Sequence, residues 1–253
     1  MQELGPGSGA DVDAAQPPIV MLHGLLLGSL ASWYFTAAPA LARSRRVILY
    51  DLRGHGLSQR VPGGYGVRAM AADLRALLDA LAPQPVALVG HSWGALVALR
   101  LALDQPARVT RLALVEAPLP PGRLDELRAF AARDPRDMAA ALPASLRAAL
   151  DGGGRRGARL LAALAFLTGE SSALADVAAE PDVPDDVLRG VRCPVLLAYG
   201  TDSSCLPVGE RLARVIPGAH LARLSGGHYL HLDATAALTH ALEVFLAEAR
   251  PHA

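Results

Sequence analysis

The chain has 253 residues, of which 52% are hydrophobic and 19% are charged, so it is long enough to bury one core. Basic and acidic side chains number 24 each, and this balance excludes a strong overall field for nucleic acid or an anionic membrane. We therefore expect a small neutral or apolar substrate, with neither a nucleic-acid nor a membrane partner.

The first 16 residues carry acids where a secretory signal needs a basic region, and they contain no apolar run. We interpret residues 1–16 as the flexible leader of a cytoplasmic protein. No segment approaches the roughly 20 apolar residues of a membrane span. Without a secretion signal, Cys193 and Cys205 are expected to be free thiols.

Apolar runs of strand type alternate with helical patterns along the chain. The runs lie at residues 18–24, 46–54, 85–92, 111–118, 194–200 and 219–228. Between the second and third runs, a methionine and four leucines recur at three- and four-residue spacing over residues 70–81, which predicts a helix. The segment after Ser92 is apolar nearly all round and predicts a deeply packed helix that stops near Asp104. This order predicts an α/β fold, with six mainly parallel strands and helices on both faces of the sheet.

The stretch from residue 119 to residue 190 has helical patterning and no convincing strand. It is too long for a simple connection, because loops in compact domains have a median length of about 4–6 residues. We therefore predict a small helical cap at residues 119–190, inserted between two parts of a core at residues 17–118 and 191–253.

The segment Gly90-His91-Ser92-Trp93-Gly94 matches the pattern G-x-S-x-G where a buried strand turns directly into a buried helix. That is the setting of a nucleophile elbow, in which a strained turn lifts the serine oxygen out of the sheet. Side chains at the two glycine positions would crowd such a turn. The segment therefore predicts Ser92 as a catalytic nucleophile.

A serine hydroxyl needs a base, an acid to orient that base, and donors for the oxyanion. His228 follows the last strand in a glycine-flanked loop and is the predicted base, because ligands bind at the carboxyl edge of such sheets. The backbone N–H groups of Leu25 and Trp93 are the predicted oxyanion donors. His55 is expected to be packed in a loop, and His231 to be a surface or capping residue.

Neither a metal nor a cofactor is predicted. His228 and His231 with Asp233 lack the H-E-x-x-H pattern and show no third, distant ligand. The glycines of residues 151–157 neither follow a strand nor match a phosphate-binding loop.

Five segments, HGLLLG, DLRGHGLS, GHSWG, YGTDSSCLP and GGHYLHLD, occur in the order typical of the α/β-hydrolase superfamily, which the chain resembles from about residue 18 onward. The resemblance implies Ser92 as nucleophile, His228 as base and a helical lid over the sheet. Members usually begin with an antiparallel hairpin. We expect that hairpin to be missing, because the residues before Pro17 are few and poor in strand formers.

The triad acid stays open between two carboxylates. Superfamily members usually carry an aspartate at the place of Ser203, and here Asp202 lies one residue earlier. Other members carry the acid at the end of the preceding strand, where this chain has Glu116. Both choices keep the chain order serine, acid, histidine, and Glu116 is slightly preferred.

These residues predict a serine hydrolase that cleaves an ester, thioester or lactone of a small, largely apolar substrate through an acyl-enzyme. A carrier-bound acyl group, and acyl release or ring closure in a biosynthetic pathway, fall within this prediction. Relatives that open epoxides or displace halide resemble this fold but use aspartate in place of Ser92, which argues against both reactions. The alternative is a non-hydrolytic member, such as a ligand receptor or a cofactor-free lyase, or a carbon–carbon bond hydrolase. The oligomeric state is not predicted.

Overall fold

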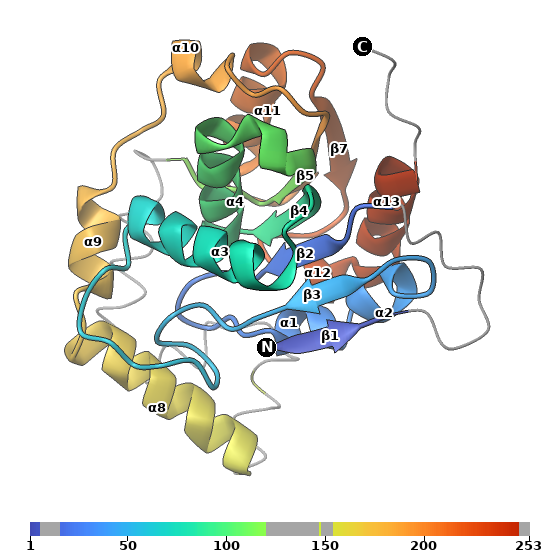
Figure 1. Ribbon diagram of the computed structural model, residues 1–253. Helices are drawn as coiled ribbons and strands as arrows, with labels where there is room; N and C mark the ends of the chain where they lie inside the picture. Colours follow the sequence, from blue (N-terminus) through green and yellow to red (C-terminus); the bar gives the residue numbers. More distant parts are fainter. Residues whose placement is uncertain (6–15, 120–146, 148–153, 248–253) are drawn as a thin grey trace.

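The computed structural model describes residues 1–5, 16–119, 147 and 154–247. At its centre is a seven-stranded sheet with the order β1-β3-β2-β4-β5-β6-β7 (Figure 1). The strands are β1 (Gln2–Leu4), β2 (Ile19–Leu22), β3 (Val47–Leu49), β4 (Val86–His91), β5 (Val109–Val115), β6 (Val195–Gly200) and β7 (His220–Leu224). All neighbouring pairs are parallel except β1 with β3. The predicted α/β class is confirmed, and β2 to β7 are the six predicted parallel strands.

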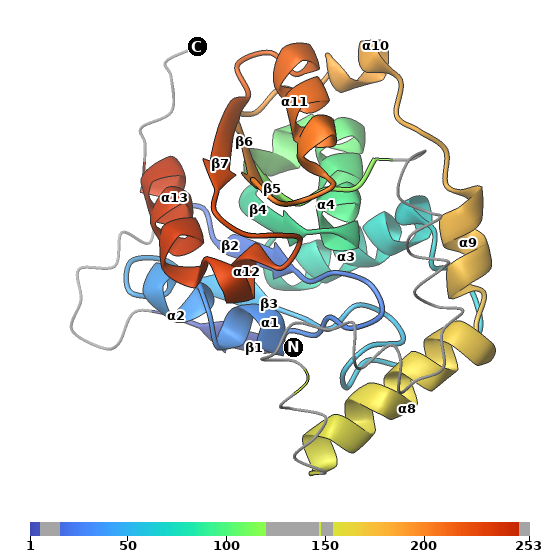
Figure 2. The same cartoon turned by 180° about the vertical axis from the view of Figure 1, so that it is seen from behind.

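Helices cover both faces of this sheet (Figures 1 and 2). Those described are α1 (Ala31–Tyr34), α2 (Ala38–Leu41), α3 (Val67–Leu81), α4 (Trp93–Asp104), α8 (Arg155–Gly169), α9 (Ala173–Ala179), α10 (Asp185–Leu188), α11 (Leu206–Val215), α12 (Leu230–Asp233), α13 (Thr235–Ala247) and the short 3₁₀ helix η1 (Pro106–Arg108). The helix predicted over residues 70–81 is α3. The apolar helix after Ser92 is α4, and it ends at Asp104 as predicted.

Successive strand residues point to opposite faces, so a sheet that is covered on both sides must be apolar at every position. In β2, Val20 and Leu22 belong to a core cluster that also contains Met70 of α3. Ile19 and its neighbours of the same parity belong to a second cluster, which contains Leu238 of α13. This two-sided burial explains the unbroken apolar runs of the sequence.

The N-terminal leader contributes a strand at the sheet edge, so the interpretation of residues 1–16 as a flexible leader was wrong for Gln2–Leu4. β1 pairs antiparallel with β3, and the Glu3 carboxylate accepts hydrogen bonds of 2.6 and 2.9 Å from the Arg46 guanidinium. Only one of its three residues, Leu4, is apolar, so periodicity could not reveal it. β1 pairs with the backbone N–H and C=O groups along the edge of β3, and this edge exists only once the sheet has formed.

The described part of the segment predicted as a cap is helical. Residues 154–190 hold α8, α9 and α10, and α8 and α9 lie at the opposite side of the molecule from α13 in both views (Figures 1 and 2). Asp176 of α9 accepts a hydrogen bond of 2.7 Å from the Tyr65 N–H, and Glu180 accepts one of 2.9 Å from the Val67 N–H at the start of α3. Carboxylates at a helix N-terminus are stabilising. Residues 120–146 and 148–153, including the first glycines of the glycine-rich stretch, lie outside the described residues.

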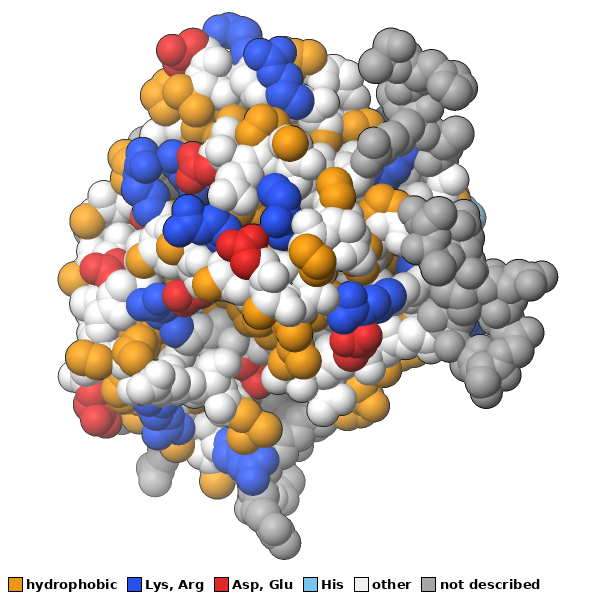
Figure 3. Space-filling model, in the orientation of Figure 1, with side chains coloured by type: hydrophobic (Ala, Val, Ile, Leu, Met, Phe, Trp, Pro, Cys, Tyr) orange, Lys and Arg blue, Asp and Glu red, His pale blue; other side chains and the backbone are white. Residues whose placement is uncertain are grey.

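Over the described residues, no single helix is both long and apolar enough to cross a membrane. One bent pair, Ala158–Gly169 with Ala173–Ala179, reaches the required length and apolar composition when its two helices are taken together. Cys193 and Cys205 form no disulfide, as predicted. On the face seen in Figure 3, acidic and basic side chains are interspersed without a broad patch of one sign, which agrees with the balanced composition.

Removal of β1 is expected to destabilise the fold modestly. A variant that starts at residue 6 exposes the edge of β3 and loses backbone hydrogen bonds, each contributing about 0.5–1.5 kcal/mol before the entropy of ordering is subtracted. We expect a net loss of about 1 kcal/mol, equivalent to a fall of about 2–4 °C in melting temperature. Calorimetry measures this fall. Glu3→Ala, which removes only a half-exposed ion pair, should cause a smaller one. An unchanged melting temperature after truncation would contradict the expectation.

Candidate active site

Ser92 lies in the turn between β4 and α4 with φ 53° and ψ −121°. A Cβ atom on Gly90 would lie 2.5 Å from the Ala95 Cα, and one on Gly94 would lie 2.4 Å from the His23 carbonyl oxygen. Only glycine fits at these two positions, because both contacts are with backbone. This strained turn, with glycine on both sides of the serine, has the geometry predicted for a nucleophile elbow.

The structure brings Ser92, His228 and Glu116 together. His228 follows β7 and Glu116 follows β5, so the parallel sheet carries both to the same edge. The His228 Nε2 atom lies 3.0 Å from Ser92 Oγ, and its Nδ1 atom lies 3.3 Å from Glu116 Oε2. With the carboxylate accepting from Nδ1–H, the Nε2 lone pair faces the serine hydroxyl.

The Glu116 carboxylate is fully buried and held on both oxygens. Oε1 accepts a hydrogen bond of 2.5 Å from the Gly200 N–H, and Oε2 accepts one from the Ser203 hydroxyl. Ser203 Oγ in turn accepts a hydrogen bond of 3.0 Å from the Cys205 N–H. The glutamate therefore presents one fixed oxygen to His228.

Asp202, the other carboxylate considered from the sequence, is exposed, and it is not the carboxylate that contacts His228. Its backbone N–H donates to the Gly226 carbonyl at 3.0 Å, which fixes the loop with the side chain outward. Ser203, at the usual place of the superfamily's aspartate, is buried and directed at Glu116. The structure therefore brings Glu116 to the histidine and leaves Asp202 in solvent.

The loop after β2 lies against Ser92, since a Cβ atom on Gly24 would lie 3.2 Å from the Ser92 Cβ. Leu26 has φ 65°, and its N–H donates to His55 Nε2 at 2.9 Å. The backbone N–H groups of Leu25 and Trp93 donate no hydrogen bond to any described residue. Both remain available to a bound ligand at the predicted oxyanion position.

Two buried histidines hold this loop in place. His23 donates from Nδ1–H to the Gly24 carbonyl at 2.8 Å and accepts at Nε2 from the Leu52 N–H at 3.0 Å. His55 likewise donates to the Arg53 carbonyl and accepts from Leu26, which confirms that it is packed in a loop. Desolvation by burial lowers the pKa of His23 to about 3 and that of His55 to about 4, so both rings are neutral.

His91 and His231 form a second buried pair behind His228. The His91 ring nitrogen Nε2 donates to the His228 carbonyl at 2.8 Å, and burial holds the pKa of His91 well below its usual value. His231 is 4% exposed, with its ring centroid 4.5 Å from that of His91, and burial lowers its pKa to about 4. The expectation that His231 is a surface residue was wrong, because α12 turns its side chain inward.

A cavity of about 690 Å³ lies above Ser92 and His228. Its wall is mixed. The apolar part includes Leu25, Leu27 and Leu30 from the loop after β2 and Leu160 and Ala163 from α8, and Ser29, Ser32 and Thr36 are among its polar residues. Among the described lining residues, two carry charged side chains, Arg159 and Asp51. Both Asp51 oxygens accept backbone hydrogen bonds, from the Leu30 and Leu57 N–H groups. The cavity suits a small, mostly apolar ligand.

The neutral buried histidines predict an acid-sensitive fold. In the unfolded chain they bind protons near their ordinary pKa of 6.5, whereas in the folded chain His55 and His231 do so only near 4 and His23 near 3. Between these values the unfolded state holds more protons, so the free energy of unfolding falls as the pH falls below 6.5. The slope is about 1.4 kcal/mol per pH unit for each such histidine.

Urea unfolding between about pH 7.5 and pH 5 measures this slope. The His220→Gln variant, which changes an exposed histidine, should keep the same slope. A free energy of unfolding that stays constant over this range would show that the buried rings are not the neutral groups described above.

Comparison with known proteins identifies the family. A family model described as alpha/beta hydrolase fold matches residues 17–235. "Putative carbamate hydrolase RutD" of Variovorax paradoxus (strain S110) is 35% identical over 243 residues, which cover 90% of this chain and 91% of that protein. "Magnesium-chelatase 30 kDa subunit" of Rhodobacter capsulatus is 31% identical over 256 residues, with coverage of 90% and 84%.

Among solved structures, that of a hydrolase from Pseudomonas aeruginosa PA01 is 29% identical, with a TM-score of 0.75 and coverage of 94% of this chain and 92% of that one. This match agrees with the family model. The chain belongs to the α/β-hydrolase family and is a hydrolase of that superfamily.

Proposed function

We propose that this hydrolase cleaves an ester, thioester or lactone of a small, largely apolar substrate through an acyl-enzyme. The observation that carries the proposal is the continuous contact from Glu116 Oε2 to His228 and on to Ser92 Oγ, with distances of 3.3 and 3.0 Å. Nucleophile, base and orienting acid are in hydrogen-bond reach of one another, as acyl transfer requires.

In the first half of the reaction, Ser92 Oγ attacks the substrate carbonyl while its proton passes to His228 Nε2. The buried Glu116 carboxylate stabilises the imidazolium that forms and keeps its Nδ1–H in place. The N–H groups of Leu25 and Trp93 donate to the oxyanion of the tetrahedral intermediate. Collapse breaks the bond to the leaving group, which takes the proton from Nε2 and departs, leaving an acyl-Ser92 ester.

In the second half, His228 takes a proton from water or from a substrate hydroxyl, whose oxygen attacks the acyl-Ser92 carbonyl. The intermediate collapses, the proton on Nε2 returns to Ser92 Oγ, and the acid or ring-closed product leaves. The positive charge that forms on His228 lies between the fully buried Glu116 carboxylate and the oxyanion of the substrate. This is consistent with a carboxylate that is shielded from solvent.

The cavity wall supports this substrate class. A volume of about 690 Å³, with leucines and alanines in its wall beside hydroxyl side chains, suits an acyl group of moderate size. We propose that α8 to α10 form the cap over this cavity, since Leu160 and Ala163 of α8 line it. Carbamate hydrolysis, named for the Variovorax relative, is acyl transfer of the same kind and belongs among the substrates to be screened.

The Ser92→Ala variant tests the nucleophile. It should lower aryl-ester turnover by at least about 10³-fold, because the remaining oxyanion donors and binding groups supply only a residual rate. A fluorophosphonate probe should label the wild-type chain and fail to label the variant. Ser44→Ala, at an exposed serine, is the matched control and should behave as the wild type. Labelling of Ser92→Ala at the wild-type rate would refute the proposal, and an unlabelled wild type would favour a ligand receptor.

The Glu116→Gln and Asp202→Asn pair tests the acid. An amide at position 116 no longer stabilises the imidazolium, so we expect a fall of about 10³–10⁴ in turnover. Asp202→Asn should stay within about twofold of wild type, because its side chain is exposed. Steady-state kinetics on one aryl ester measures both. The reverse order of the two losses would assign the acid to Asp202.

A further inference from the structure

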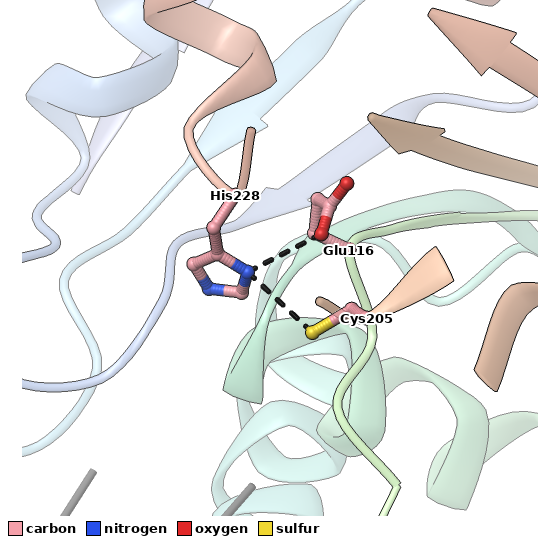
Figure 4. A group of neighbouring side chains, drawn as sticks. All are labelled: Glu116, Cys205 and His228. Atoms are coloured by element: carbon pink, nitrogen blue, oxygen red, sulfur yellow. Dashed lines mark hydrogen bonds and ion pairs between the residues drawn. The ribbon is translucent and has the colours of Figure 1, made fainter. Parts of the chain in front are cut away.

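Three potential metal ligands, Glu116, Cys205 and His228, lie together at the Nδ1 side of the His228 ring. Cys205 Sγ lies 3.7 Å from the same Nδ1 atom that contacts Glu116 Oε2 at 3.3 Å (Figure 4). The ligand atoms of all three residues lie within 4.8 Å of one another. They come from the end of β5, the start of α11 and the loop after β7, so the sequence pattern does not reveal their proximity.

Two of the three ligand separations match those of a tetrahedral zinc ion. With Zn–N and Zn–O bonds near 2.1 Å and a Zn–S bond near 2.3 Å, ideal ligand separations are about 3.4 Å for nitrogen to oxygen and about 3.6 Å for nitrogen to sulfur. The observed separations are 3.3 Å for nitrogen to oxygen and 3.7 Å for nitrogen to sulfur. The carboxylate oxygen and the sulfur, ideally about 3.6 Å apart, lie within 4.8 Å of each other, so binding would draw these two side chains closer together. A soft thiolate, an imidazole and a carboxylate form a donor set that zinc accepts, while the thiolate disfavours magnesium and calcium.

The charge at this place favours a cation. The Glu116 carboxylate is fully buried, and its Oε2 atom lies 3.3 Å from the His228 Nδ1 atom. The Gly200 N–H and the Ser203 hydroxyl already hold the carboxylate and can orient it as a ligand. A divalent ion would compensate the buried negative charge of Glu116 and the charge of the thiolate that Cys205 forms when it binds the ion.

We propose that Glu116, Cys205 and His228 bind Zn²⁺ and that the bound ion switches the catalytic centre off. Binding replaces the thiol S–H bond by a Zn–S bond and releases that proton to solvent. The zinc also takes the Nδ1 lone pair, so the single ring proton of neutral His228 moves to Nε2. Nε2–H then donates to Ser92 Oγ and can no longer accept its proton. The inhibitory part of this proposal rests on the proposed function, whereas the metal site itself does not.

Cobalt spectroscopy tests the site without any activity. Co²⁺ added to the chelator-treated chain should give a near-ultraviolet thiolate-to-cobalt charge-transfer band, which Zn²⁺ then removes by displacement. Cys205→Ser and Cys205→Ala should both lose the band, and Cys193→Ser, which changes the other cysteine, should keep it. Two Cys205 variants are used so that at least one folded protein, verified by circular dichroism, is compared. The absence of a band in the wild type, or its persistence in a folded Cys205 variant, would overturn the site.

Inhibition tests the switch. Zn²⁺ should inhibit aryl-ester hydrolysis by the wild type, and a chelator should restore the rate. With each rate expressed relative to the metal-free rate of the same variant, loss of the thiol ligand should raise the half-inhibitory zinc concentration at least about tenfold. Cys193→Ser should match the wild type. Equal zinc sensitivity with and without Cys205 would overturn the switch. A wild type that lacks hydrolytic activity even without metal would refute the proposed function, and the cobalt band would still decide the site.

Discussion

The constraint on which this structure depends is that six parallel strands all end at one edge of one sheet. The chain turns sharply there after several of these strands. The chain leaves β2, β4 and β5 close to Leu26, Ser92 and Glu116, the three non-glycine residues with positive φ in the described part of the chain. Such conformations cost about 1–3 kcal/mol each and persist only where the surroundings enforce them. These three strained residues lie at one edge of the sheet, where the packing of the surrounding core stabilises their conformations and fixes the site side chains in position.

Neutral histidines are the main means by which these turns are held. A neutral imidazole donates from one nitrogen and accepts at the other, so it can connect two backbone segments without introducing charge. His23 and His55 connect the loop after β2 to the loop after β3 in this way, and His91 connects the end of β4 to the backbone of His228. Burial keeps their pKa values low and their rings uncharged. The same burial makes the edge of the sheet sensitive to acid.

The carboxylate beside His228 comes from the end of β5, and a residue after the neighbouring strand β6 supports it. β5 and β6 are paired in parallel and end side by side, so Glu116 after β5 and Ser203 after β6 meet near the His228 ring. The Ser203 hydroxyl donates to the Glu116 carboxylate. The arrangement also brings the Cys205 thiol next to His228. The result is one histidine nitrogen for which a proton and a metal ion would compete.

The sequence by itself determined the α/β class, the parallel sheet, the helix after Ser92 and the positions of Ser92 and His228 near the sheet edge. These features follow from local patterns, because apolar runs, helical spacing and a G-x-S-x-G turn are each encoded within a few consecutive residues. Only the tertiary structure decided the rest. It brought Glu116 rather than Asp202 to His228 and placed Cys205 beside the same histidine. It also buried His231 and paired β1, which has two polar residues out of three, with β3. Each of these outcomes depends on contacts between segments far apart in the chain, whose relative positions exist only after the sheet has formed.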